Sequence, residues 1–289
     1  MQTELTEHET AEQSDGESRE RSARTPPDRC LSLTVEGPWG HFRRVDGNTI
    51  KATYRLPPRT TVAGLLAAVA GYERDGYYDV FDRDRSGIAV QPVASGDDAS
   101  ETASIPRTMN LPENSLTTSN EGMKAVNARG KVSVRYPDPQ ADRQRVNYEV
   151  LVEPAYRLDV WLADDAAYDR LHDRLADGRS EYVPSLGLSE FLASVTFHGE
   201  FSPEQLSESD DPVAVESALP APDGIVPSSD HPHGTERSPG DMTTTERSGE
   251  FTGRKTTEYL RWAYSRDGTA LKATGVDAMR VDGRTVVFS

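Results

Sequence analysis

The segment that decides the fold is LSLTVEGPWGHFRRVDGNTIKATYRLPPRTTVAGLLAAVAG, residues 31–71. Apolar and polar residues alternate from Cys30 to Glu36, which is the pattern of a half-buried β-strand. The Gly-Pro pair at 37–38 ends this strand. A loop that carries glycine, aromatic and basic residues follows, so the segment opens as strand and then loop.

A helix closes the same segment. Two prolines at 57–58 force extended backbone just before it, and Thr60 or Thr61 can cap its first turn. Apolar residues then recur at helical spacing from Val62 to Val69, until Gly71 ends the helix. Small residues between them allow the helix to pack closely on a sheet.

Similar patterns continue along the chain. Further strands are expected near Ile88–Val93, Val146–Glu153, Ala155–Leu162 and Ala193–Phe201. Asp164 or Asp165 can cap a second helix, whose apolar stripe is Tyr168, Leu171 and Leu175. The order is therefore strand, helix, strand, a long excursion, and then strand, helix, strand.

This order predicts an α+β fold, a ferredoxin-like βαββαβ domain similar to RNA-recognition folds. Right-handed crossovers would place both helices on one face of an antiparallel sheet and leave the other face free to hold RNA. The excursion at 105–147 is polar and basic-leaning, which indicates an inserted thumb-like β-hairpin. The RNA-binding domain is expected to span residues 30–201.

Three other regions complete the predicted organisation. Residues 1–29 carry almost no large apolar side chains and are expected to be a disordered acidic tail. Residues 202–250 are acidic and rich in serine and proline, which indicates a linker or loop. A small C-terminal β extension is expected at 251–289, with strands near Tyr259–Tyr264, Leu271–Thr274 and Thr285–Phe288 and hairpin-type turns at 267–268 and 282–283.

Composition narrows the class of protein. The 289 residues carry a formal net charge of -16, and only five of the 32 cations are lysines. An acidic, lysine-poor composition is typical of halophilic proteins. The single cysteine, Cys30, excludes an internal disulfide and an all-cysteine metal site. Without a long apolar run or a signal-peptide pattern, we expect a cytoplasmic protein.

A basic cluster interrupts this acidic background between residues 43 and 59. It is the kind of site that attracts a polyanion. Arginine can hold phosphate through two hydrogen bonds, and neighbouring aromatic side chains can stack on unpaired bases. The candidate RNA-binding residues of this region are Trp39, His41, Arg43, Arg44, Lys51, Tyr54, Arg55 and Arg59. The candidates of the thumb are Arg107, Lys124, Arg129, Lys131 and Arg135.

Four stretches together resemble one family. They are GPWGHFRR with KATYRLPPRTTVAGLLAAVAG, then YVPSLGLSEFLA at 182–193, SALPAPDGIVP at 217–227 and GVDAMRVDGRTVVFS at 275–289. In this order they resemble the Cas-five family of CRISPR-associated proteins, in the haloarchaeal subtype I-B version. The resemblance covers roughly residues 30–289.

The resemblance implies a fold and a function. Members belong to the RAMP superfamily of RNA-binding proteins, built on a ferredoxin-like domain with a thumb-like hairpin. The implied role is to hold the repeat-derived 5′ handle of the crRNA in a type I Cascade complex that serves antiviral defence. The implied partners are the crRNA, the backbone subunit, whose filament this subunit caps, and the large subunit, with target DNA contacted indirectly. No cofactor, metal ion or membrane contact is expected.

Two alternatives remain open from the residues alone. A metal-independent endoribonuclease that processes CRISPR repeat RNA needs a base, a cation and an acid, which His41, Lys51 and Tyr54 could supply. No histidine adjoins Lys124 or Lys131, where the cutting relatives of subtype I-C would place a Lys-His pair. A pure protein-interaction subunit is the other alternative.

Overall fold

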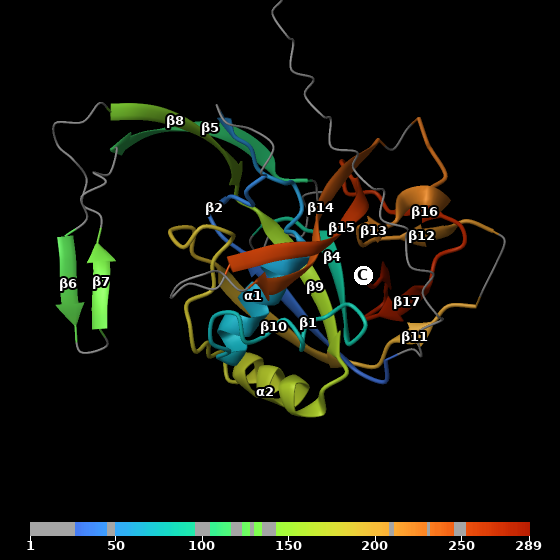
Figure 1. Ribbon diagram of the computed structural model, residues 1–289. Coiled ribbons are helices and arrows are strands. Elements are labelled where there is room, and N and C mark those ends of the chain that lie inside the picture. The colour runs from blue at the N-terminus through green and yellow to red at the C-terminus, as the bar shows by residue number, and fades with distance from the viewer. Residues whose placement is uncertain are drawn as a thin grey trace, which may run out of the picture.

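The structure is a computed structural model (Figure 1). It describes residues 27–44, 50–95, 105–116, 123–127, 130–134, 143–207, 211–229, 232–245 and 253–289. The expected tail therefore lies outside the described residues, apart from its last three positions. One of these, Arg29, donates hydrogen bonds to the carboxylates of Asp165 and Asp169.

A four-stranded antiparallel sheet organises the N-terminal two thirds of the chain. Its strands are β1 (Cys30–Glu36), β4 (Ser86–Pro92), β9 (Ala155–Leu162) and β10 (Ser194–Phe201), in the order β10-β1-β9-β4. Helix α1 (Arg59–Ala70) connects β1 to β4, and α2 (Asp165–Ala176) connects β9 to β10. The strands and helices thus follow one another as the sequence predicts, and the fold is α+β.

The two helices begin differently. Asp164 caps α2, because its carboxylate accepts a hydrogen bond from the Ala167 N–H at 3.0 Å, as predicted. The predicted threonine cap of α1 is wrong. Pro58 is the N-cap, and its carbonyl accepts from the N–H groups of Thr61 and of the next residue. Gly71 ends α1 in the left-handed conformation, as expected.

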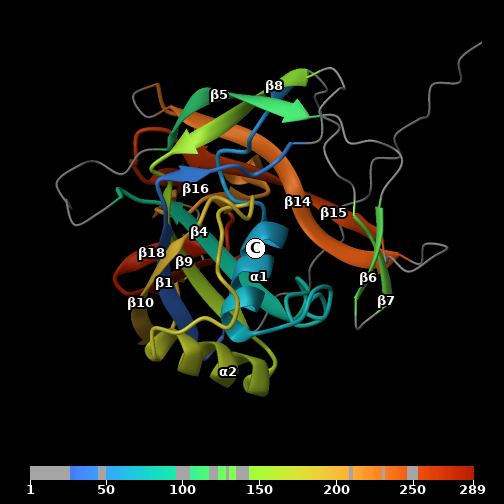
Figure 2. The ribbon, with the colours of Figure 1, turned by 90° about the vertical axis from the view of Figure 1, so that its left-hand side faces the viewer.

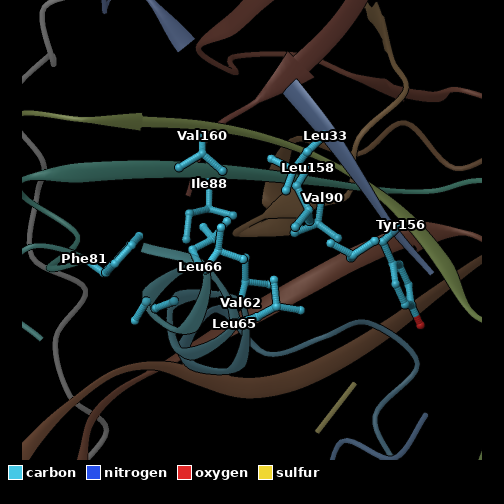
Figure 3. Packing of buried hydrophobic residues seen from close by; sticks show 14 of the residues in the cluster. Leu33, Val62, Leu65, Leu66, Phe81, Ile88, Val90, Tyr156, Leu158 and Val160 are labelled. Atoms are coloured by element: carbon cyan, nitrogen blue, oxygen red, sulfur yellow. The ribbon is translucent and has the colours of Figure 1, made fainter. Parts of the chain in front are cut away.

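The main core lies between this sheet and α1 (Figure 3). Val62 and Leu66 of α1 meet Ile88 of β4 and Leu158 of β9, all at most 2% exposed. Burial of several such side chains is the main stabilising contribution. The core therefore holds α1 on one face of the sheet and fixes where the loop before α1 can lie.

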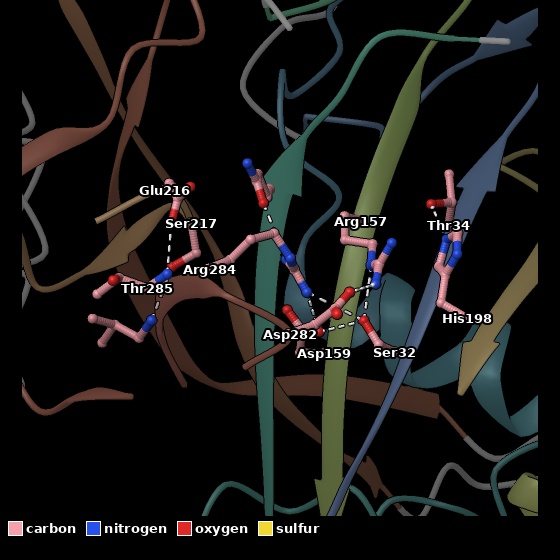
Figure 4. Close-up of polar contacts among 12 residues, drawn as sticks. Ser32, Thr34, Arg157, Asp159, His198, Glu216, Ser217, Asp282, Arg284 and Thr285 are labelled. Atoms are coloured by element: carbon pink, nitrogen blue, oxygen red, sulfur yellow. Dashed lines mark hydrogen bonds and ion pairs between the residues drawn. The ribbon is translucent and has the colours of Figure 1, made fainter. Parts of the chain in front are cut away.

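The other face of the sheet is covered in part, which corrects the expectation that it is free. The strands β17 (Ala278–Val281) and β18 (Arg284–Val287) pack over it. Arg284 donates to the buried Asp159 at 2.7 Å, and Arg157 donates to Asp282 at 2.9 Å (Figure 4). Because side chains alternate between the two faces of a sheet, Asp159 lies on this face. A buried carboxylate is stable only when a cationic or hydrogen-bonding partner is present. The C-terminal strands supply that partner.

An arm projects from the sheet (Figures 1 and 2). Strand β5 (Arg107–Leu116) pairs antiparallel with β8 (Arg143–Val152), and β6 (Met123–Asn127) pairs with β7 (Gly130–Val134). The four strands occupy most of the expected thumb, and β8 continues past it to the start of β9. We refer to β5 to β8 as the arm, and to the end of β5 and β8 nearest the sheet as the arm root.

The prediction of a linker or loop at 202–250 is wrong for the residues described there. This region contains β11 (Glu204–Gln205), β12 (Val213–Val215), β13 (Leu219–Pro220), the short 3-10 helix η1 (Pro222–Gly224) and β14 (His233–Thr245). β14 pairs along its length with β15 (Gly253–Ser265). These backbone hydrogen bonds order a polar sequence that has little apolar alternation of its own.

The expected C-terminal strands are present as β15, β16 (Leu271–Ala273) and β18, with β17 in addition. The turn at 282–283 joins β17 to β18 as a hairpin, and both its residues have positive φ angles of 51° and 75°. The turn at 267–268 is not a hairpin turn, because β15 and β16 belong to different sheets. In the described part of the chain, no helix is long and apolar enough to span a bilayer.

Candidate nucleic-acid interface

The basic loop, residues 39–55, is attached to the arm root through two short strands. Strand β2 (Trp39–Gly40) pairs with Val152 and Leu151 of β8, and β3 (Ile50–Lys51) pairs in parallel with Asn147 and Tyr148 of the same strand. These pairings bring together two segments that lie about a hundred residues apart in the sequence. The loop and the arm root form one structural unit, which we call the basic site.

Two short segments inside the loop run side by side. Arg43 and Thr53 form an isolated antiparallel bridge, and the Arg44 N–H donates to the Ala52 carbonyl at 2.9 Å. The Tyr54 N–H donates to the Phe42 carbonyl at 2.8 Å. The tip between them, residues 45–49, lies outside the described residues. The pairing gives both arginines a defined backbone position.

Arg43 and Arg44 are exposed cations of the basic loop. The Arg44 guanidinium lies 5.5 Å from the centre of the Tyr54 ring, a cation–π distance. Within the described ranges, Arg43 forms no ion pair with a carboxylate. Trp39, on β2 of the same loop, is also exposed. Exposed guanidinium groups can bind phosphate, and an exposed indole can stack on a base.

Arg55 instead links the loop to the arm. Its guanidinium donates to the Glu149 carboxylate at 3.1 Å, and the same carboxylate accepts the Thr53 N–H at 3.1 Å. Glu149 lies on β8, so this contact fixes the arm root relative to the loop. Lys51 is partly buried on β3 nearby. The arrangement gives Arg55 a positioning role in the described structure.

A second carboxylate holds the next stretch of backbone. Glu236 of β14 accepts hydrogen bonds from the N–H groups of Arg55 and Leu56, at 3.0 and 2.8 Å. Burial raises the pKa of Glu236, and the two backbone donors oppose that rise. Strand β14 is therefore part of the support of the basic site, which the sequence did not indicate.

Two aromatic candidates are buried. His41 is 1% exposed, and its Nδ1 donates to the Glu149 carbonyl at 2.8 Å because a carbonyl can only accept. Burial lowers the pKa of His41. Tyr54 is also buried, with its ring beneath Arg44. Neither side chain is placed to meet RNA at the surface, and two members of the alternative His41, Lys51 and Tyr54 set are inside the protein.

Arg59 is a correction to the candidate set, because it lies in the core at 1% exposure. Its guanidinium donates to the carbonyl of Phe81 at 2.7 Å, and to the carbonyl and hydroxyl oxygens of Ser86 at 3.2 and 2.6 Å. These acceptors lie just before β4 and at its start. Arg59 therefore joins the first turn of α1 to the edge of the sheet.

The structure places the arm candidates only in part. Arg107 is exposed at the start of β5, while Lys124 and Lys131 lie on β6 and β7. Arg129 and Arg135 lie outside the described residues. Two exposed apolar residues, Met109 and Leu111, share the alternating face of β5 with Arg107. Sequence reasoning missed both, although the period of two in residues 107–111 is a usable signal.

The segment 182–193 packs directly against the basic loop. The His41 N–H donates to the Leu186 carbonyl at 3.0 Å. Gly187 has φ 96°, and a Cβ there would lie 2.0 Å from the His41 carbonyl oxygen. Only glycine fits this close approach. Two motifs that are about 140 residues apart in the sequence thus form one contact.

No group of three or more histidine, cysteine or acidic side chains in the described ranges is arranged to hold a metal ion. The basic site instead offers guanidinium groups, one indole and two exposed apolar side chains. This set is suited to phosphates and unpaired bases.

A family model described as "CRISPR-associated protein (Cas_Cas5)" matches residues 30–254. No curated protein matches the chain. Two similar solved structures are a chain of a "CRISPR RNA-guided surveillance complex" and a "CRISPR protein from Archaeoglobus fulgidus". Their identities are 15% and 14% and their TM-scores 0.47 and 0.45. The alignments cover 86% and 90% of this chain, and 95% and 98% of theirs.

A third structure, of a "Type III-B Cmr-beta bound to cognate target RNA and AMPPnP", is 13% identical with a TM-score of 0.38. The alignment covers 84% of this chain and 86% of that chain.

Proposed function

Because the chain belongs to the Cas5 family of CRISPR-associated proteins, we propose that it is a non-catalytic subunit of a type I-B CRISPR effector complex that binds the 5′ handle of the crRNA. The family match confirms the resemblance that the sequence motifs indicated. The subtype, the halophilic source and the handle role belong to the proposal.

The observation that carries the proposal is the basic site at the arm root. Arg43 and Arg44 are exposed there in a chain of net charge -16, and Trp39 of the same loop is exposed as well. In concentrated salt, the release of counterions contributes little to binding, so short-range contacts must supply the affinity. Bidentate arginine–phosphate pairs and base stacking are contacts of that kind.

The arm extends the same surface. Met109 and Leu111 present apolar side chains to solvent on the face that Arg107 shares. Apolar side chains of this size can wedge between neighbouring bases and bend a strand. The arm would then hold the nucleotides that follow the handle, with Lys124 and Lys131 further along it.

The fold supports an RNA-binding module. The order β10-β1-β9-β4, with α1 and α2 as crossovers, agrees with a ferredoxin-like domain in which the arm is inserted between β4 and β9. The proposed partners are the crRNA, the backbone subunit whose filament this chain caps, and the large subunit.

Recovery of bound RNA tests the proposal. The tagged full-length chain is purified from its host at native salt, and the short RNAs that accompany it are sequenced. The proposal predicts RNAs that share one repeat-derived 5′ end. Random RNA fragments or no RNA would contradict it. Site-specific cleavage of repeat RNA by the purified chain without metal would contradict the non-catalytic part.

A further inference from the structure

Outside the basic site, two arginines face each other on the ribbon of β14 and β15. Arg237 and Arg261 are direct cross-strand partners in the antiparallel register. Like charges placed opposite each other destabilise a pair of strands. The neighbouring residues Leu260 and Trp262 point into the core, so the two arginines lie on the opposite, outward face. The ribbon starts near β5 and β8 and continues past α1 (Figure 2).

The charges of the two arginines are compensated differently. Arg261 forms an exposed ion pair with Asp223 of η1. Arg237 has no carboxylate partner in the part of the chain that the structure describes. Its guanidinium lies 4.7 Å from the centre of the Tyr259 ring, and this ring is 44% exposed. An acidic chain therefore keeps an uncompensated cation stacked on an accessible aromatic ring.

The chemistry of this patch fits a nucleic-acid strand better than an acidic peptide. A planar guanidinium stacked on a phenol ring offers phosphate binding and base stacking at one place. The patch also adjoins the basic site, since Glu236 precedes Arg237 on β14 and binds the backbone of Arg55. A strand that leaves the basic site can reach the outward face by crossing this edge strand.

We infer that the outward face of β14 and β15, formed by Arg237, Tyr259 and Arg261, is a second contact for single-stranded RNA. This inference rests on the proposed function, because it concerns the same RNA after it leaves the basic site. Stacking on Tyr259 contributes affinity that survives high salt, and Arg237 binds a neighbouring phosphate.

The test uses the full-length chain and a fluorescent single-stranded oligouridylate as the probe, in salt that keeps the chain folded. Tyr259→Ala is expected to weaken binding by about fivefold to a hundredfold, the range for one lost stacked base. Tyr259→Phe keeps the ring and should bind like the wild type. Tyr182→Ala removes a similarly exposed tyrosine, at 48% exposure, whose backbone N–H binds the Ala68 carbonyl of α1 and not the basic loop, and it serves as the matched control.

A second readout needs no variant and therefore does not depend on whether a variant folds. Ultraviolet cross-linking of the purified ribonucleoprotein should attach nucleotides to peptides that contain Tyr259. Arg237→Gln should weaken binding more at low than at high salt, whereas Arg179→Gln, at an exposed arginine in the loop after α2, should have no effect.

The outcomes separate the inference from the proposed function. If Arg43→Gln with Arg44→Gln abolishes binding while Tyr259→Ala binds normally and gives no cross-link, the inference is overturned and the proposed function stands. If no variant and no wild-type protein binds RNA, both fail. Loss of a protein subunit from the complex with unchanged RNA binding would also overturn the inference.

Discussion

Substitution of Arg59 tests most sharply whether a residue of the basic cluster at 43–59 stabilises the fold or binds RNA. The sequence places it in a basic cluster, but the structure buries its guanidinium against the carbonyls of Phe81 and Ser86 and within 3.4 Å of the Ser289 carbonyl. Arg59→Met keeps a side chain of similar length and removes every donor. The change therefore separates the contribution of the hydrogen bonds from that of packing.

The cost follows from the acceptors that lose their donor. The Ser86 hydroxyl still donates to the Asp82 carbonyl, so it keeps a partner. The Phe81 carbonyl loses a bond of 2.7 Å. A buried polar group without a partner costs about 1–3 kcal/mol. Because the contacts to Ser86 and Ser289 are lost as well, the free energy of unfolding should fall by about 2–4 kcal/mol.

Denaturant unfolding at native salt measures this difference. RNA affinity, measured below the transition, should stay within about twofold of the wild type. A variant that unfolds like the wild type and binds RNA much more weakly would show instead that Arg59 is a surface contact to RNA.

Three further predictions concern the support of the basic site. Gly187→Ala should lower the free energy of unfolding by more than about 1 kcal/mol, because a Cβ would lie 2.0 Å from the His41 carbonyl oxygen at a positive φ; a melting temperature equal to the wild type would contradict this. Glu149→Gln should speed amide hydrogen exchange at the arm root, because the charged contact to Arg55 is lost; unchanged exchange would show that the contact does not hold the arm. Burial raises the pKa of Glu236 above its ordinary 4.5. The folded protein therefore binds the proton on the Glu236 carboxyl more tightly than the unfolded chain does. The wild type should lose stability relative to Glu236→Gln as the pH rises from 4.5 through the raised pKa. The same pH profile for both proteins would contradict this prediction.

Local patterns predicted the elements whose signal is complete within a few residues. Spacing of the apolar residues between Val62 and Val69 gave α1, and one carboxylate before an apolar stripe gave the Asp164 cap of α2. The order of these elements along the chain then predicted the α+β class. Such signals do not depend on contacts with distant parts of the chain.

Long-range contacts explain what was missed. Strand β14 reads HGTERSPGDMTTT, with a proline, two glycines and almost no apolar alternation. It is ordered because it pairs with β15, and Pro239 is tolerated because β14 lies at the edge of its sheet. Likewise, nothing local separates Arg59 from Arg43. Only the position of the acceptors before and on β4 decides that one is buried and the other exposed.

The most direct measurement is the position of the crRNA 5′ end in the assembled complex, determined by cryo-electron microscopy at native salt. We predict that phosphates of its first nucleotides lie within hydrogen-bond distance of the guanidinium groups of Arg43 and Arg44. Density for those nucleotides on another subunit, with both arginines facing solvent, would contradict it.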